Sequence, residues 1–585
     1  MSTNAPAHIS SAKSDPAVAA RWSIQTFLLP ALIVAVSLAV RVAAFIHWGA
    51  GAIESEGAEY ARIAENLRHG LGYVGIVTPG PELMFPPLYP LLIAAFSFLT
   101  RDYLWAGRLV SLLFGALLPL PAYGIASRLF NRRVGLIAAA LFVFHPLFIS
   151  LSYSVLTEGP YATLLLSAVY LVLCALDRPT LPIWSFVGAA FGVAYLLRPE
   201  AVAPLTIAVF LAPVATDGSL FTRGKRAAVA ILAFLVLASP EVIFLYKNTG
   251  HLRLEAKSAV TSPLAVLILN KEAGRGPAGM PALDYNEAIK WGSAAVDADM
   301  RRIGIWLRPE VDVARDPISA RDLARIVRAA IRQNTPLFLQ ALSSRWLGAP
   351  FLPALALLGA FRRPWRRSTA AKHFYFALVP ATAILASFVV LWIFTRYYFA
   401  IVPFLLIYAA NGLAAIASWT KASFATWQRT GASGLVPWIV PSVLGVVLLI
   451  YPARDVRSLY EFREGSSANQ VVRDAGLWIK AQQKAPVTIM DRATPLAFHA
   501  DAQFVYFPYC SGDLALRFLD DAKVDYVVLR RNENFTPYYN EWLAKGIPDR
   551  RAELVYVSSG EDPGQILIFR WHRADSLLPE QSAGY

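Results

Sequence analysis

Two acids in this sequence stand where a carboxylate could take part in a reaction. Glu56 opens a predicted amphipathic helix, EGAEYARIAENLRHG, and Tyr60 follows one helical turn later. Glu158 comes directly after Thr157 at the start of a long apolar stretch. A carboxylate in such a position can take the proton of a hydroxyl group that attacks a second molecule. Both acids also have a structural explanation, because an acid in the first turn of a helix stabilises the positive end of the helix dipole.

Several cations stand near the ends of other apolar stretches, where they could bind phosphate. Arg198 and Glu200 share the segment LLRPEA, and Arg396 lies between aromatic residues in FTRYYFAIVPF. Arg41 and Lys257 are weaker candidates. Arginine can bind phosphate oxygens with paired hydrogen bonds. The structural alternatives are an ion pair between Arg198 and Glu200, anchoring of Arg396 at the membrane interface, and purely structural roles for Arg41 and Lys257.

The elements that must position these residues are membrane helices. The chain has 585 residues, of which 56% are hydrophobic and 16% are charged, and its mean hydropathy is +0.46. This composition excludes a single soluble core and predicts a polytopic α-helical membrane protein. The net charge of +14 lies mostly in short basic clusters between apolar stretches. Such clusters set the orientation of membrane helices, so we expect the lipid bilayer, and no nucleic acid, as a partner.

Keeping the basic clusters on the cytoplasmic side predicts about eleven transmembrane helices. Residues 1–22 are then a cytoplasmic tail, and residues 23–452 form the transmembrane domain. Residues 85–99 are apolar but too short to span, so we expect them to lie along the outer surface. The predicted spans cover residues 23–45, 108–130, 134–152, 158–176, 181–197, 201–217, 227–246, 337–360, 373–394, 397–419 and 435–452.

This path leaves three pieces on the outer side: the loops 48–107 and 247–335, and the tail 453–585. The tail has lower hydropathy and alternating segments, and we expect a small soluble α/β domain. Its predicted strands are VTIM, FVYF, DYVVL, ELVYV and ILIFRW, and its predicted helices are ANQVVRDAGLWIKAQQ and GDLALRFLDDA. The acids and arginines of five segments all reach this outer face. Their convergence favours one shared site over separate structural roles.

Common cofactor motifs are absent from the sequence. It has no GxGxxG or GxxxxGK[ST] loop, no HExxH and no paired CxxC. Nucleotide, ATP and zinc chemistry therefore have no visible anchor. We expect no cofactor and no metal site, although a requirement for a divalent metal stays open.

An ordered series of segments resembles a known family. RVAAF, EGAEYARIAENLRHGLGY, FPPLYPLLIA, WAGRLVSLLFG, FHPLFISLSYSVLTEGPY, LLRPEA and TRYYFAIVPFLLIYAANG occur in the order seen in glycosyltransferase family 39 membrane enzymes. This group includes protein O-mannosyltransferases, aminoarabinose transferases of lipid A and galacturonosyltransferases of lipopolysaccharide. The resemblance covers about residues 23–420. It implies a GT-C fold, with surface helices in the first outer loop and a cavity that faces outward.

The resemblance also implies roles for particular residues. The family's first-loop acid falls on Glu56, and its second acid falls on Glu158. Some relatives carry another acid directly after the first, where this chain has Gly57, and a cation before the Pro pair, where this chain has Phe85. The late family arginine falls on Arg396. Because Phe85 replaces that cation, one phosphate contact is missing here or comes from another residue, for which Lys257 is a candidate.

The implied activity is an inverting transfer of sugar from a polyprenyl-phosphate carrier to a hydroxyl of a glycolipid, glycan or protein, at the outer face of a bacterial inner membrane. Glu56 and Glu158 would be catalytic. The expected substrate-binding residues are Arg396, Arg198, Lys257, Tyr60, Glu200 and Arg41. A flippase or transporter of lipid-linked saccharides, an oligosaccharide ligase or polymerase, and a non-enzymatic scaffold or receptor are the alternatives. The sugar and the acceptor are not predicted.

Overall fold

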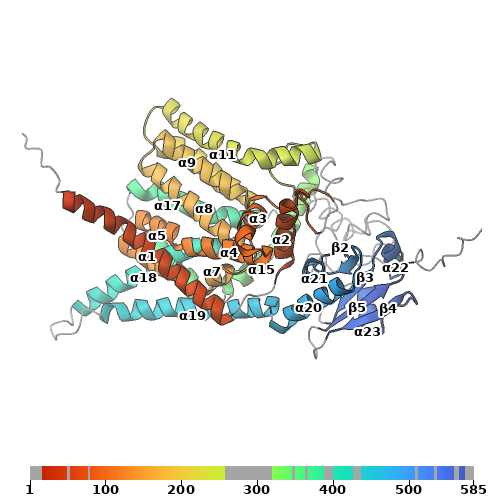
Figure 1. The fold of residues 1–585 in the computed structure, drawn as a ribbon. Helices are drawn as coiled ribbons and strands as arrows, with labels where there is room; N and C mark the ends of the chain where they lie inside the picture. The colour runs from red at the N-terminus through yellow and green to blue at the C-terminus, as the bar shows by residue number, and fades with distance from the viewer. Residues whose placement is uncertain are drawn as a thin grey trace, which may run out of the picture.

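A computed structural model shows a large bundle of helices followed by a small domain built around a β-sheet (Figure 1). The long helix α19 leads from the bundle toward the sheet domain, and α2 lies on the side of the bundle that faces this domain. The structure describes residues 16–48, 53–76, 80–256, 319–344, 350–362, 367–387, 399–425, 436–464, 466–507, 512–531, 537–558 and 565–573.

The bundle begins with α1 (Pro16–Trp48), α2 (Ser55–Arg68) and α3 (Leu88–Thr100). The helix α2 confirms the amphipathic helix predicted in the first outer loop. It is followed by Gly70, whose φ of 73° belongs to the left-handed region that glycine enters without steric cost. The helix α3 covers most of the apolar run 85–99, whose expected place along the outer surface stays a prediction.

Eight helices follow, and two of the predicted spans each consist of two successive helices. The predicted span 108–130 consists of α4 and α5, and the span 134–152 consists of α6 and α7. Both α5 and α7 begin with a proline, which has no N–H to leave unpaired and suits the first position of a helix. The helices are α4 (Tyr103–Leu117), α5 (Pro119–Leu129), α6 (Arg132–Phe144), α7 (Pro146–Leu151), α8 (Glu158–Asp177), α9 (Leu181–Tyr195), α10 (Val202–Ala215) and α11 (Leu220–Thr249). A short 3-10 helix, η1 (Pro199–Ala201), precedes α10.

The second half of the bundle consists of helices separated by segments outside the described residues. Its members are α15 (Ala320–Ser343), α16 (Phe351–Phe361), α17 (Arg367–Ser387), α18 (Val402–Ala425) and α19 (Val436–Glu464). The predicted span 337–360 corresponds to the end of α15 together with α16.

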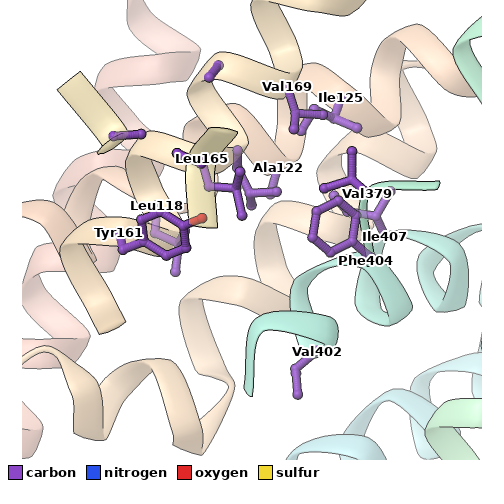
Figure 2. Close-up of a cluster of buried hydrophobic side chains, with 14 of the residues drawn as sticks. Leu118, Ala122, Ile125, Tyr161, Leu165, Val169, Val379, Val402, Phe404 and Ile407 are labelled. Carbon is purple, nitrogen blue, oxygen red and sulfur yellow. The ribbon is translucent and has the colours of Figure 1, made fainter. Parts of the chain in front are cut away.

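Apolar side chains fill the interior of this bundle. Figure 2 shows Ala122 of α5 beside Leu165 of α8, and Val379 of α17 beside Phe404 and Ile407 of α18. Segments far apart in the sequence therefore share one core. The outer surface is also apolar, because α1 and α10 expose several large hydrophobic side chains. Apolar surface on this scale requires lipid as its solvent.

Five helical stretches within the described residues are long and apolar enough to cross a membrane. They are Phe27–His47, Tyr103–Leu129, Glu158–Asp177, Leu220–Thr249 and Phe399–Ser423, and shorter apolar helices accompany them. The chain is thus a multi-pass membrane protein, as predicted. The expected total of about eleven spans stays a prediction.

The sheet domain confirms the small α/β fold predicted for the tail. All five predicted strands and both predicted helices are present, whereas the short helices α21 and α23, of 7 and 9 residues, were not predicted. In chain order the elements are α20 (Ser466–Gln482), β1 (Thr488–Asp491), α21 (Thr494–Ala500), β2 (Gln503–Tyr506), α22 (Gly512–Asp521), β3 (Tyr526–Arg530), α23 (Pro537–Lys545), β4 (Ala552–Val557) and β5 (Ile566–Trp571).

The sheet has the strand order β2-β1-β3-β5-β4, in which β1 is parallel to β2 and β3, and β5 is antiparallel to β3 and β4. Alternate side chains face opposite sides of the sheet. Met490 and Val527 pack with α22 and α23, while Ile489 and Val528 pack with α20 and α21. This second core, which we call the α21-side core, also contains Ala58 of α2.

Candidate active site

The helix α2 brings Glu56 and Tyr60 onto one face. Glu56 occupies the first turn and is half-buried, and Tyr60 is buried one turn later. The rings of Phe85 and Tyr89 each lie 5.1 Å from the ring of Tyr60, centroid to centroid. These aromatic contacts fix the side of α2 that carries Glu56.

The Tyr60 hydroxyl lies where the predicted site residues meet. Burial raises the pKa of Tyr60 well above its ordinary value, and the negative charges of Glu56 and Glu158 raise it further. The positive charge of Arg198 and a hydrogen bond with the Thr157 side chain oppose this shift. Tyr60 therefore stays protonated at neutral pH. The charges of these residues therefore act on one buried hydroxyl.

Arg198 connects the two other acids of the site. Its Nη1 lies 3.4 Å from Oε1 of Glu158, and its Nη2 lies 3.1 Å from Oε1 of Glu200. The Glu158 side chain is 11% exposed, whereas that of Glu200 is 49% exposed. The guanidinium also lies 5.7 Å from the ring centroid of Tyr161. The ion pair between Arg198 and Glu200 was predicted. The pair between Arg198 and Glu158 was not, and it links the start of α8 to the residue before η1.

Backbone contacts hold these elements together. The amide of Leu88 at the start of α3 donates to the carbonyl of Leu196, just before Arg198. A Cβ added at Gly57 would lie 2.9 Å from the carbonyl oxygen of Val155, and one at Gly107 would lie 2.7 Å from Cγ1 of Val155. The turn before Glu158 thus packs tightly between α2 and α4.

The structure brings together five of the eight predicted site residues: Glu56, Tyr60, Glu158, Arg198 and Glu200. Such a group can bind and deprotonate an acceptor hydroxyl, because it offers carboxylates beside a cation. A phosphate diester bound beside these acids would need further positive charge. The two residues predicted to supply it, Lys257 and Arg396, lie outside the described residues.

Arg41 lies within the bundle and is fully buried. Its Nε donates to the Ser152 hydroxyl at 2.9 Å, and its Nη1 donates to the Ser37 hydroxyl at 2.6 Å. Its guanidinium also donates to the carbonyls of Phe142 and Val143 at the end of α6. These bonds attach α1 to α6 and to the segment after α7, which is a structural role. The predicted role of Arg41 in substrate binding stays a prediction.

Sequence reasoning did not single out a second group of acids beside the site. Glu59 and Glu82 are each 2% exposed, and their Oε1 atoms accept hydrogen bonds from the amides of Ile76 and Met84. Burial raises the pKa of Tyr506 in the sheet domain, and the charges of both acids raise it further. Glu59 could have been found from the helical pattern, because it lies on the buried side of α2. Within the described residues, no group of His, Cys, Asp or Glu has the composition of a metal site, and independence from metal stays a prediction.

Comparison with known proteins agrees with this architecture. Residues 85–244 match a family model described as dolichyl-phosphate-mannose-protein mannosyltransferase. No curated protein matches the sequence. Archaeal oligosaccharyltransferase AglB from Archaeoglobus fulgidus, in complex with an inhibitory peptide and a dolichol-phosphate, has a TM-score of 0.56 at 12% identity, over 86% of this chain and 70% of that chain.

ArnT from Cupriavidus metallidurans bound to undecaprenyl phosphate has a TM-score of 0.52 at 12% identity, over 92% of this chain and 97% of that chain. The apo state of the same protein has a TM-score of 0.51 at 13% identity. Likeness at this level of identity establishes the fold, and the predicted GT-C fold is confirmed.

Proposed function

We propose that this chain is a membrane glycosyltransferase that moves one hexose or pentose from a polyprenyl-phosphate carrier to an acceptor hydroxyl. The observation that carries the proposal is the convergence of Glu56, Glu158 and Arg198 around Tyr60 in a GT-C fold. The matched family model names a dolichyl-phosphate-mannose donor, and the ArnT structure contains undecaprenyl phosphate. Both support a lipid phosphate as the sugar carrier.

In the proposed reaction, the acceptor oxygen attacks the anomeric carbon while Glu56 takes the hydroxyl proton. The bond between that carbon and the phosphate oxygen breaks, its electron pair stays with the polyprenyl phosphate, and the configuration of the sugar inverts. Phosphate is a competent leaving group, so no general acid is required. Glu158 would orient the acceptor, because its ion pair with Arg198 fixes its carboxylate.

The departing phosphate needs positive charge where negative charge develops. Arg198 already faces two carboxylates, at 3.4 Å and 3.1 Å. We therefore assign the main phosphate contact to Arg396, with Lys257 and Arg198 assisting. No nucleotide or metal takes part in this scheme.

We further propose that residues 1–22 are cytoplasmic, and that residues 23–452 form the catalytic domain in the inner membrane of a bacterium. Residues 453–585 would then form an extracytoplasmic domain. This orientation places the site at the outer face, where it can meet a glycolipid, glycan or protein acceptor. It is supported by the charge of the short loops between apolar stretches.

The test compares the wild-type protein with Glu56→Gln after reconstitution with undecaprenyl-phosphate sugars and with candidate lipid and protein acceptors. Donor consumption and product are followed by mass spectrometry. General-base assistance is worth about 100- to 10,000-fold, so Glu56→Gln should lose at least that much turnover while donor affinity stays unchanged. Glu541→Gln is the matched control, because Glu541 is an exposed acid on α23.

Four outcomes would change the proposal. Equal turnover by wild type and Glu56→Gln would remove Glu56 as the base. Turnover only with lipid-linked oligosaccharides would identify an oligosaccharide ligase. Movement of intact donors across the vesicle membrane without sugar transfer would identify a transporter, and loss of turnover on adding EDTA would overturn the metal-free scheme.

A further inference from the structure

The helix α2 has two opposite faces that contact different parts of the molecule. Glu56 and Tyr60 face the bundle, where Tyr60 packs on Phe85 and Tyr89. Ala58 and Arg62 lie about half a turn away around the helix axis, because successive residues rotate by about 100°. The second face contacts the sheet domain. One helix is therefore shared between the candidate active site and a separate folded unit (Figure 1).

Arg62 makes the main polar contact of this second face. Its Nη1 lies 2.6 Å from Oδ1 of Asp501, and its Nη2 donates to the carbonyl of Phe498 at 3.4 Å. The guanidinium also lies 5.5 Å from the centroid of the Phe498 ring. The Arg62 side chain is only 14% exposed, whereas that of Asp501 is 49% exposed, so solvent partly screens the ion pair and the contacts of the guanidinium with Phe498 add to it.

A second polar contact joins the N-terminal end of α2 to the sheet domain. The hydroxyl of Thr494, at the start of α21, donates to the carbonyl of Ser55 at 3.0 Å. Ser55 directly precedes Glu56 in the chain. The two polar contacts therefore bracket the turn that carries the proposed catalytic base.

Apolar packing between these polar contacts is continuous. Ala58 is fully buried in the α21-side core, together with Leu496 and Ala497 of α21. Ile76, from the loop after α2, belongs to the same core. The sheet domain thus completes part of its own core with residues of the first outer loop.

The helix needs this support because its own length gives it little stability. It has 14 residues, and its N-cap residue Glu54 makes no side-chain capping bond. Isolated helices of this length are marginally stable, so packing on both faces determines where α2 lies. A displacement of about 1 Å can lower the rate of a positioned reaction by about 100-fold.

We propose that the C-terminal sheet domain positions α2 for catalysis, and that Arg62 and Asp501 are positioning residues of the transfer reaction. This inference rests on the proposed function, because it assigns Glu56 the role of base. Arg62 and Asp501 act through the helix and do not touch the reacting atoms.

Conservative substitutions make the test specific. Asp501 ends α21 with a φ of 55°, a left-handed conformation that Asn also adopts readily. Asp501→Asn therefore removes the charge and keeps the turn, and Arg62→Gln removes the partner charge. Arg62→Lys keeps a charge but loses the forked geometry of the guanidinium. Glu541→Gln with Lys545→Gln is the matched control, because this exposed pair lies in the same domain.

The experiment measures kcat and the KM for the donor, together with amide hydrogen exchange of residues 57–68, in the full-length protein. Arg62→Gln and Asp501→Asn should each lower kcat by about 10- to 100-fold with KM nearly unchanged, and should speed exchange in α2. The double variant should be no worse than the worse single variant, and Arg62→Lys should recover part of kcat. The control pair should change neither quantity.

Two results would overturn the inference. The first is an active wild-type protein whose Arg62 and Asp501 variants keep full kcat. The second is unchanged exchange of α2 in these variants, which can be read even if the wild type transfers no sugar from any donor. If only the proposed function is wrong, the wild type transfers no sugar, but α2 still exchanges faster in Arg62→Gln than in the wild type.

Discussion

Arg198 is paired with two acids that differ in their exposure to solvent. Glu158 is largely buried, whereas Glu200 is half-exposed. Removing Arg198 leaves a buried carboxylate without this partner, which costs about 1–3 kcal/mol. A pair with an exposed acid is worth about 0–1 kcal/mol. We therefore expect Arg198→Gln to lower both the thermal stability and kcat, and Glu200→Gln to change either one little.

Thermal melts in detergent and turnover with the best donor would check this asymmetry. Arg198→Lys separates charge from geometry, since lysine cannot reach both acids with one planar group. An equal effect of Arg198→Gln and Glu200→Gln would show that the ion pair with Glu158 contributes nothing further to thermal stability or kcat.

The sequence located most of these residues but not the direction in which they point. Glu158, Arg198 and Glu200 lie next to the ends of apolar segments, which the sequence shows directly, whereas Glu56 and Tyr60 share one face of an amphipathic helix. Arg41 also lies in an apolar segment, yet its side chain turns into the bundle and bonds to Ser37 and Ser152. Rotation about a helix axis depends on neighbouring helices, which hydropathy does not reveal.

At the scale of elements, the contact between α2 and the turn before Glu158 depends on Gly57. A Cβ at this position would lie 2.9 Å from the carbonyl oxygen of Val155 and 3.2 Å from its Cβ. We expect Gly57→Ala to push α2 away from this turn, to destabilise the protein by about 1–3 kcal/mol and to lower kcat by about tenfold or more. The resemblance places a second acid at this position in some relatives, for which this packing leaves no room.

Gly224→Ala is the control for that substitution. Gly224 lies within α11, and nothing lies within 4 Å of its added Cβ. Alanine there should be neutral or should stabilise by about 0.5–1 kcal/mol, since glycine is a poor helix former. Thermal melts and turnover of both variants would show whether the effect of Gly57→Ala comes from close packing or from any Gly-to-Ala change.

Elements with a strong local pattern were predictable, and their interruptions were not. The helix α2 follows from the helical spacing of its buried residues. The strands follow from short runs of apolar residues, although β1, β3 and β5 are buried on both faces. The break at His145, before Pro146, was missed because apolar residues lie on both sides of it. The docking of α21 on α2 could not be predicted, since it depends on contacts between residues that are far apart in the sequence.

At the scale of the whole molecule, His499 makes the stability of the sheet domain depend on pH. Burial lowers the pKa of His499 from 6.5 to about 4, and the charges of Arg473 and Arg108 lower it further while Asp102 opposes them. The folded domain therefore keeps His499 neutral, whereas the unfolded chain takes up a proton below about pH 6.5. Unfolding is favoured progressively as the pH falls from about 6.5 to about 4.

Hydrogen exchange of β1 and β3 in the full-length protein, measured between pH 7.5 and 4.5 and corrected for intrinsic rates, would follow this loss. The equilibrium constant for opening should rise by up to about tenfold per pH unit. His499→Gln should flatten the dependence. Asp501 also makes the stability of the sheet domain depend on pH, but in a lower pH range. Burial alone would raise its pKa, but Arg62 and Lys480 lower it below 3.8, so its contribution is lost only in stronger acid.

The presence of Ala58 and Ile76 in the α21-side core has a consequence for how such proteins diversify. A terminal domain whose core includes residues of the segment around α2 cannot be exchanged at the junction after α19 alone. In a chimera that takes this domain from a relative, the core of the transferred domain would lack its matching residues, and α2 of this chain would lack its matching partner. The segment around α2 and the terminal domain should therefore be inherited together, as one unit split between two distant stretches of the gene.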